Sequence, residues 1–202
     1  MDEQIKVVID ADFFINITEY ERGTGLFLKV MDDLGLEPVM HEFVANTELK
    51  GNLYLQQLLD KGLVSIVSYK DYLKEEDKAE YAEYFMRAYE KVNCRDFSPK
   101  DDIYDYADQD ESLGEIRSLY MARKLGYIYF MSDDADAKML AKNFFSSKKK
   151  VKVKSLFDVL IMCKERDTNL RWKDINPTVT NAMRKRQDKI GRLKELYCEM
   201  PY

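Results

Sequence analysis

Val7-Val8-Ile9-Asp10-Ala11-Asp12-Phe13-Phe14, near the start of the chain, has the pattern of a buried strand that runs into two aspartates. The three apolar residues suit a strand that is covered on both faces. Asp10 follows where such a strand leaves the sheet, and in open α/β sheets ligands gather at the carboxyl ends of the strands. Alternatively, Asp10 and Asp12 only open a turn or cap a helix.

A second strand with the same ending lies later in the chain. Tyr127–Met131 is apolar and aromatic, and Ser132, Asp133, Asp134 and Asp136 follow it. Further short strands are expected at 63–67 and 151–153, and helical spacing of apolar residues separates the strands. Strands that alternate with helices predict βαβ units and a mostly parallel sheet.

Three other segments have distinct patterns. Residues 70–93 are acidic and aromatic, and their spacing predicts a helix packed over the sheet, whereas residues 96–110 have the composition of a loop. Pro177 predicts a break over 174–179, and residues 181–196 have the spacing of a polar, basic helix.

The composition describes a globular chain of 202 residues, with 46% hydrophobic and 34% charged residues. No apolar run is long enough for a membrane span, and the first residues do not resemble a signal peptide. Three scattered cysteines indicate reduced thiols, so we expect a cytoplasmic location. Because His41 is the only histidine, a site with several histidine ligands is excluded.

The net charge of −5 is distributed unevenly along the chain. Residues 1–147 contain 17 Lys and Arg against 30 Asp and Glu, whereas residues 148–202 contain 15 against 7. A basic C-terminal quarter suits an anionic partner, although a solvated basic surface has the same composition.

Several acids occupy positions where they can converge. In a parallel sheet, Asp10 and the aspartates after Met131 lie at the same edge. Glu115 begins a predicted helix, and Glu42 and Glu48 lie on the helix expected after Pro38. Converging carboxylates repel one another unless a cation lies among them, and oxygen ligands alone favour Mg²⁺ or Mn²⁺. Such sites typically cleave phosphate esters.

Four motifs resemble those of the PIN domains, over about residues 5 to 160 and in consistent order. They are Val7–Phe14, Pro38–Leu49, Leu113–Ile116 with Ala122 and Gly126, and Met131–Asp134. The resemblance implies a three-layer α/β/α sandwich with a mostly parallel sheet over residues 1–165, and a basic helical extension over 166–202. Residues 70–110 would be an insertion or covering segment.

The resemblance also implies roles for single residues in an Mg²⁺- or Mn²⁺-dependent endoribonuclease, and many members of that family are toxins of toxin–antitoxin pairs. The catalytic acids would be Asp10, Glu48, Glu115 and Asp134, and the metal would also involve Asp133. Asp12 and Asp136 would support them, and Glu42 competes with Glu48 for the second motif. Expected RNA contacts are Lys148, Lys149, Lys150, Lys152, Lys154, Arg184, Lys185, Arg186 and Lys189. An antitoxin or other protein partner and a homodimer are also expected.

Two alternatives remain open. In a haloacid-dehalogenase-like phosphatase, Asp10 would be the nucleophile, Ser68 the later hydroxyl and Asp133-Asp134 the metal acids, but Phe14 departs from that family's motif. In the second alternative, a PIN-like scaffold binds protein or RNA without cleavage.

Overall fold

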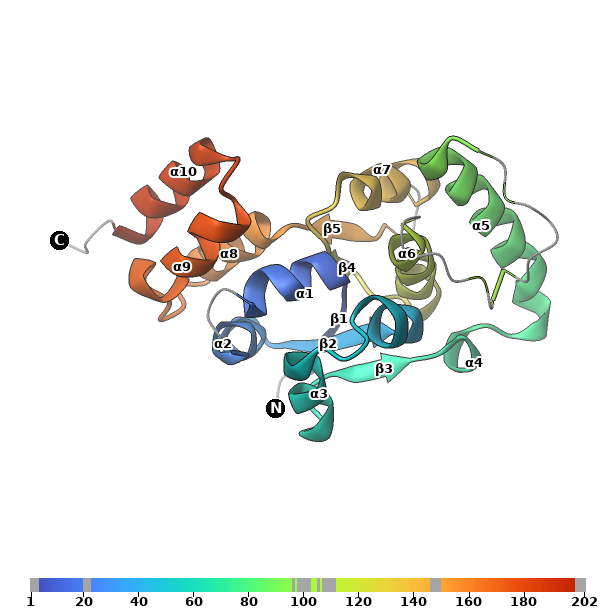
Figure 1. Ribbon diagram of the computed structural model, residues 1–202, viewed down its shortest axis with the longest axis horizontal. Helices are drawn as coiled ribbons and strands as arrows, with labels where there is room; N and C mark the ends of the chain where they lie inside the picture. The colour runs from blue at the N-terminus through green and yellow to red at the C-terminus, as the bar shows by residue number, and fades with distance from the viewer. Residues whose placement is uncertain are drawn as a thin grey trace.

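The computed structural model describes residues 4–19, 23–95, 97, 103–104, 106, 112–145 and 150–198. A five-stranded sheet with the strand order β3-β2-β1-β4-β5 lies at its centre (Figure 1). The strands are β1 (Ile5–Ile9), β2 (Leu36–His41), β3 (Ser65–Val67), β4 (Tyr129–Met131) and β5 (Lys152–Lys154). All neighbouring pairs are parallel, so the predicted α/β class with a parallel sheet is confirmed.

The central strand β1 is buried on both of its faces. Val7 and Ile9 belong to one hydrophobic core, and Val8 belongs to a second core. Because side chains alternate between the two faces of a strand, this uninterrupted apolar run requires helices on both sides of the sheet.

Helices cover both faces, as expected for a three-layer arrangement (Figure 1). The first core includes α1 (Ala11–Thr18), α2 (Gly25–Asp33), α3 (Leu53–Asp60), α8 (Leu156–Glu165), α9 (Trp172–Ala182) and α10 (Gln187–Cys198). The second includes α4 (Tyr69–Tyr72), α5 (Lys78–Asn93), α6 (Leu113–Leu125) and α7 (Ala135–Phe144). None of the helices in the described part of the chain combines the length and apolarity that a membrane span needs.

The segment predicted as one helix over 70–93 is divided. α4 ends at Tyr72, a short 3-10 turn η2 (Glu75–Asp77) follows, and α5 carries the remainder. The predicted apolar side of this segment is confirmed, because Tyr81, Phe85 and Tyr89 are buried in the second core. Most of the loop expected at 96–110 lies outside the described residues.

The region after Pro38 also differs from the expectation. Pro38 lies inside a strand, β2, which continues to His41 and pairs with β1 and β3, so the helix begins only after it. The following helix contains a π turn, η1 (Val44–Glu48), in which the Leu49 N–H donates to the Val44 carbonyl at 2.9 Å. A π turn holds one more residue than an α turn, and this change rotates the residues that follow.

The predicted break at Pro177 is wrong, because Pro177 lies inside α9. Proline removes one helical hydrogen bond, but the buried side chains Ile175 and Val179 hold this helix against the first core. The Tyr197 hydroxyl of α10 also donates to the Leu160 carbonyl of α8 at 2.6 Å. The described part of 166–198 therefore shares a core with α1 and α8, and the boundary at residue 165 stays a prediction.

Candidate active site

Asp10 lies at the carboxyl end of the central strand β1, where the strand order reverses. It follows β1 directly, and its N–H donates to the Met131 carbonyl at the end of β4 at 3.0 Å. With the order β3-β2-β1-β4-β5, the chain winds outward in opposite directions from this point, which is the common ligand-binding crevice of such sheets.

The Asp10 carboxylate does not act as a helix cap. Asp10 occupies the N-cap position of α1, yet its side chain accepts no capping hydrogen bond. It is 1% exposed, and neither carboxylate oxygen has a hydrogen-bond partner. The nearby Ser132 hydroxyl favours the ionised form, although it does not reach hydrogen-bonding geometry with either oxygen. A buried carboxylate without partners is costly, so this arrangement points to a ligand.

Glu48 reaches the same region from η1. Its carboxylate lies against Gly114 at the start of α6, so closely that a Cβ atom at position 114 would collide with both carboxylate oxygens. Burial raises the pKa of Glu48, whereas the Gly114 N–H and the charge of Arg117 lower it. Gly114 thus allows a carboxylate to lie at the positive end of a helix.

Electrostatic coupling connects these acids. Burial raises the pKa of Asp10 well above its usual value, and three neighbouring carboxylates add to that shift: Glu115, Asp12 and Glu48. Burial also raises the pKa of Glu115 to about 8, with further contributions from Glu48 and Asp134. Such mutual shifts require the carboxylates to lie near one another. The structure therefore brings together Asp10 after β1, Glu48 of η1 and Glu115 of α6, and we call these residues the acid cluster.

Asp12 and Asp133 connect the carboxyl end of β4 to the helices α1 and α8. The Asp12 carboxylate accepts hydrogen bonds from the N–H groups of Phe13 and Asp133, at 2.5 Å and 2.8 Å. The Asp133 carboxylate accepts from Asn16 Nδ2 at 3.0 Å and from the Leu156 N–H at 2.9 Å. Burial, followed by the Asp133 charge, raises the pKa of Asp12 to about 7. Both oxygens of Asp133 are thus engaged in joining β4 to α1 and α8.

The remaining predicted acids have different surroundings. Asp134 caps α7 by accepting from the Asp136 N–H at 2.7 Å, and its charge acts on Glu115. Asp136 is near the Ser112 hydroxyl, at 3.5 Å. Glu42 lies away from Asp10 and accepts from the Tyr69 N–H at 2.9 Å. Of the two candidates for the second motif, Glu48 is therefore the one at the acid cluster.

The acid cluster suits a hard divalent cation in its chemistry. Its donors are carboxylate oxygens, two of which are buried without partners on Asp10. Within the described ranges, however, no three His, Cys, Asp or Glu side chains lie closely enough to coordinate one ion. Binding would require Glu48, Glu115 or Asp134 to turn inward toward Asp10.

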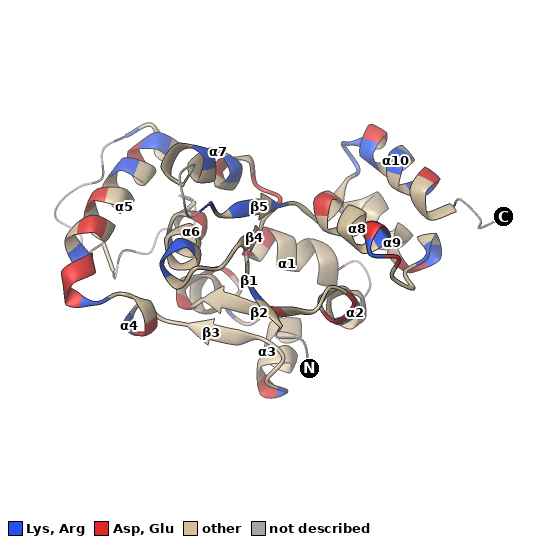
Figure 2. Cartoon of the chain, turned by 180° about the vertical axis from the view of Figure 1, so that it is seen from behind, with Lys and Arg blue, Asp and Glu red and all other residues tan. Residues whose placement is uncertain are grey.

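A groove of about 370 Å³ beside β5 gathers basic side chains. It is lined by Lys138 and Lys142 of α7 together with Lys150 and Lys152. Figure 2 shows basic residues in blue on both α7 and β5. Sequence reasoning missed Lys138 and Lys142, because only the packing of α7 on β5 places them beside the predicted lysines. Lys148 and Lys149 lie outside the described residues. The predicted Arg184, Lys185 and Arg186 are exposed between α9 and α10.

Comparison with protein-family models, with curated proteins and with solved structures yields no match. The geometry of the acid cluster is therefore the basis on which a function can be assigned.

Proposed function

We propose that this protein is a divalent-metal-dependent endoribonuclease of PIN type. The observation that carries the proposal is the buried, unpartnered carboxylate of Asp10 at the point where the strand order reverses, electrostatically coupled to Glu48 and Glu115. A set of buried acids with raised pKa values needs either protons or a cation. Phosphodiester hydrolysis is the chemistry that acidic sites of this type typically support.

In the proposed mechanism, Asp10, Glu48, Glu115 and Asp134 would hold Mg²⁺ or Mn²⁺. When bound, the ion supplies orientation of an attacking water and neutralises charge on the phosphate. The Met131 carbonyl positions Asp10, and the N–H of Gly114 positions Glu48. Asp12 and Asp133 keep α1, β4 and α8 in register around the site. With its pKa near 8, Glu115 carries a proton at neutral pH until a cation replaces it.

The basic groove beside β5 supports RNA as the substrate class. Lys138 of this groove is 3.7 Å from Asp158 of α8, and the Leu156 N–H of the same helix donates to Asp133, which follows β4. Lysines at such positions neutralise backbone phosphates without reading the sequence. A homodimer, a toxin–antitoxin pairing and a cytoplasmic location, all expected from the sequence, stay predictions.

Two observations weigh against the phosphatase alternative. Asp12 would be the second aspartate of its motif, but the Asp12 carboxylate is engaged with two backbone N–H groups. Ser68 would be its later hydroxyl, but Ser68 follows the edge strand β3, which β2 separates from β1. In a non-catalytic scaffold, no bound cation would compensate for the cost of burying the unpartnered Asp10 carboxylate.

The proposal is tested by incubating the purified protein with single-stranded RNA in Mn²⁺, Mg²⁺ or EDTA. We expect cleavage with either ion and none in EDTA, together with no hydrolysis of p-nitrophenyl phosphate. Absence of RNA cleavage with both ions would contradict the nuclease. A phosphoryl group trapped on Asp10 would support the phosphatase instead.

The substitution Gly114→Ala is expected to lower RNA cleavage by about 10-fold or more while leaving the fold intact. The new methyl group forces the Glu48 carboxylate away from α6. Because alanine favours a helix over glycine, the free energy of unfolding should stay constant or rise by up to about 1 kcal/mol. Cleavage rates and urea unfolding measure the two effects.

Gly191→Ala in α10 is a matched control, because a Cβ atom there meets no other atom within 4 Å. It should produce the same small gain in stability and leave cleavage unchanged. Equal cleavage by the two variants would show that the position of Glu48 against α6 is unimportant.

A further inference from the structure

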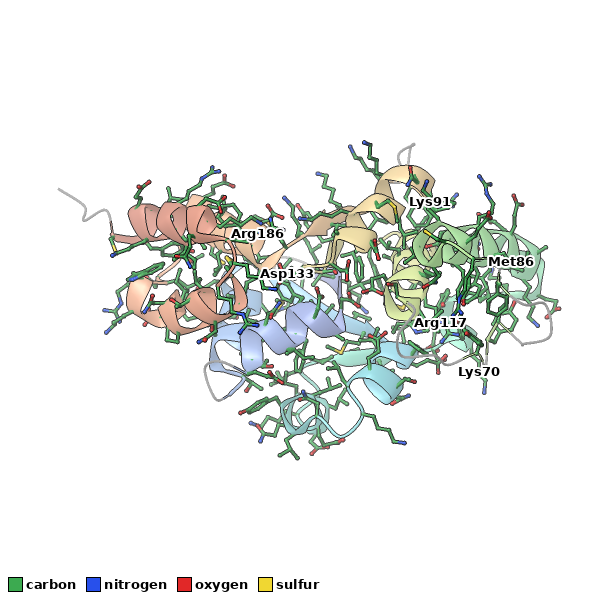
Figure 3. All side chains as sticks on the ribbon, turned by 45° about the horizontal axis from the view of Figure 1, so that its top comes forward. Lys70, Met86, Lys91, Arg117, Asp133 and Arg186 are labelled. Atoms are coloured by element: carbon green, nitrogen blue, oxygen red, sulfur yellow. The ribbon has the colours of Figure 1, made fainter. Side chains whose placement is uncertain are left out.

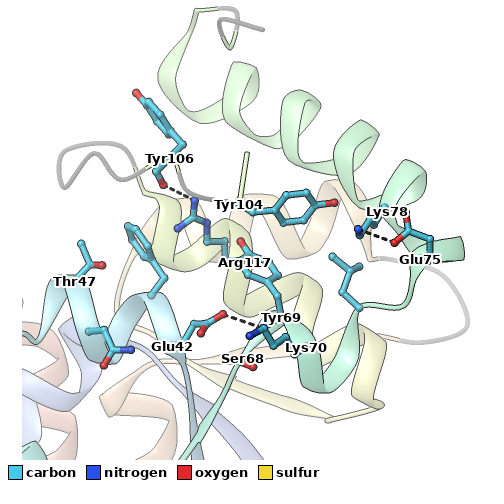
Figure 4. Close-up of a pocket in the computed structure, with 13 residues that line it drawn as sticks. Glu42, Thr47, Ser68, Tyr69, Lys70, Glu75, Lys78, Tyr104, Tyr106 and Arg117 are labelled. Carbon is cyan, nitrogen blue, oxygen red and sulfur yellow. Dashed lines mark hydrogen bonds and ion pairs between the residues drawn. The ribbon is translucent and has the colours of Figure 1, made fainter. Parts of the chain in front are cut away.

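A second cavity, of about 690 Å³, lies between η1, α4 and α6 (Figure 4). Its lining combines aromatic rings with basic side chains, among them Phe43, Tyr69, Tyr104, Tyr106, Lys70 and Arg117. The cavity has the volume of a small-molecule or nucleotide site. No part of the proposed mechanism uses it.

Arg117 is the unusual member of this lining. It is 1% exposed, and its guanidinium lies 4.1 Å from the centre of the Phe43 ring. Nη2 donates to the carbonyls of Ile103 and Tyr106, whereas the buried Nε has no hydrogen-bond partner. No carboxylate of the described residues forms an ion pair with it. A buried guanidinium that forms no ion pair and has an unpartnered N–H group favours an anionic ligand.

Neither of the two acids in the lining forms an ion pair with Arg117. Glu42 accepts from the Tyr69 N–H at 2.9 Å, and Glu75 forms an ion pair with Lys78 at 2.7 Å (Figure 4). Lys70 is exposed and makes no ion pair with any described residue. Lys70 and Arg117 lie at the end of the molecule opposite the C-terminal helices, beside which Arg186 lies (Figure 3). The cavity wall therefore has positive charge available to a ligand.

The cavity also adjoins the acid cluster. Thr47 lines the cavity, and the next residue, Glu48, lies against Gly114 at the acid cluster. On α6, Glu115 belongs to the acid cluster and Arg117 to the cavity, and the charge of Arg117 lowers the pKa of Glu48. A ligand that spans both places would carry an anionic group beside Arg117 and another beside Asp10.

We propose that this cavity is a nucleotide subsite for single-stranded RNA, next to the bond that is cleaved; the inference rests on the proposed function. Arg117 and Lys70 bind the phosphate of that nucleotide, and the tyrosines pack against its base. Tyr69 and Tyr104 both line the cavity and pack edge to face against each other, with ring centres 5.4 Å apart. Bases of unpaired strands stack on aromatic side chains, whereas bases within a duplex cannot reach them. The subsite thus selects single-stranded over double-stranded RNA.

Binding without cleavage tests this inference separately from the enzyme activity. Fluorescein-labelled single-stranded oligouridylate is titrated with the protein in EDTA, and binding is followed by fluorescence anisotropy. Lys70→Glu is expected to weaken binding by about 10-fold, since it reverses a charge beside the phosphate. Lys61→Glu, at an exposed lysine outside the cavity, is the matched control and should weaken binding much less. Equal effects of the two variants would overturn the subsite.

Photocrosslinking provides a second readout that requires no substitution in the protein. With 5-iodouridine in the same RNA, we expect crosslinks to Tyr69, Tyr104 or Tyr106. Crosslinks confined to β5 and the C-terminal helices would overturn the subsite, even if the protein cleaves RNA. Crosslinks to the tyrosines without cleavage in any ion would support the subsite and contradict the nuclease.

Discussion

Asp10→Asn is expected to reduce metal-dependent RNA cleavage by about 10³-fold or more and to stabilise the metal-free protein. Asparagine keeps the shape of the side chain but removes the charge that would bind the cation. It also removes a buried carboxylate whose pKa is raised by burial and by neighbouring acids. The free energy of unfolding without metal should therefore rise by about 1–3 kcal/mol.

Cleavage assays and urea unfolding in EDTA measure both effects of this substitution. Asp32→Asn is a suitable control, because it removes one negative charge from an exposed position on α2. The control should leave cleavage and stability nearly unchanged. An Asp10→Asn protein that cleaves RNA at the normal rate would remove Asp10 from the mechanism. Loss of stability would contradict the buried, unpartnered carboxylate.

The second large effect is a fall in the stability of the metal-free protein as the pH rises. Folding raises the pKa of Asp12 from 3.8 to about 7 and that of Glu115 from 4.5 to about 8. Between those values the folded state holds more protons than the unfolded state, so stability is lost as these protons leave. Each such proton lowers the free energy of unfolding by about 1.4 kcal/mol per pH unit.

His41 changes the free energy of unfolding in the opposite direction over part of this pH range. Burial, followed by the charge of Arg117, lowers its pKa from 6.5 to about 3. Stability linked to His41 is therefore gained as the pH rises toward 6.5 and is constant above it. The carboxylates alone determine the slope between pH 6.5 and 8, which is the most informative window.

Urea unfolding in EDTA at several pH values measures this dependence. Addition of Mn²⁺ or Mg²⁺ should flatten it above pH 6.5, because a cation replaces the protons and stabilises the folded state by its binding. Glu115→Gln should also flatten it without metal. A metal-free protein that becomes more stable between pH 6.5 and 8 would contradict the raised pKa values.

Local sequence patterns were sufficient for the central part of the fold. The apolar runs before Asp10 and Asp133 predicted the adjacent strands β1 and β4, since a strand buried on both faces needs an unbroken apolar run. The position at which α6 ends was also predictable from a local pattern. Gly126 adopts a φ of 76° and donates to the carbonyls of Ala122 and Arg123, a conformation that glycine adopts without strain.

The C-terminal helices illustrate where a local pattern fails. Pro177 predicted a break, because a proline cannot donate a helical hydrogen bond. Packing of Ile175 and Val179 in the core outweighs that single loss. A sequence shows the unfavourable local contribution but not the burial that compensates for it.

The sequence by itself determined the fold class, the two central strands and the acids that end them, because these depend on short runs of apolar residues and on neighbours along the chain. Only the tertiary structure decided which acids meet. A π turn separates Glu48 from Glu42, the missing Cβ of Gly114 admits the Glu48 carboxylate, and Asp133 is engaged with distant N–H groups. Arg117 became visible as a buried guanidinium with an unpartnered Nε only once its surroundings were known. Side-chain direction and charge compensation depend on contacts between segments far apart in the chain, and no local pattern encodes them.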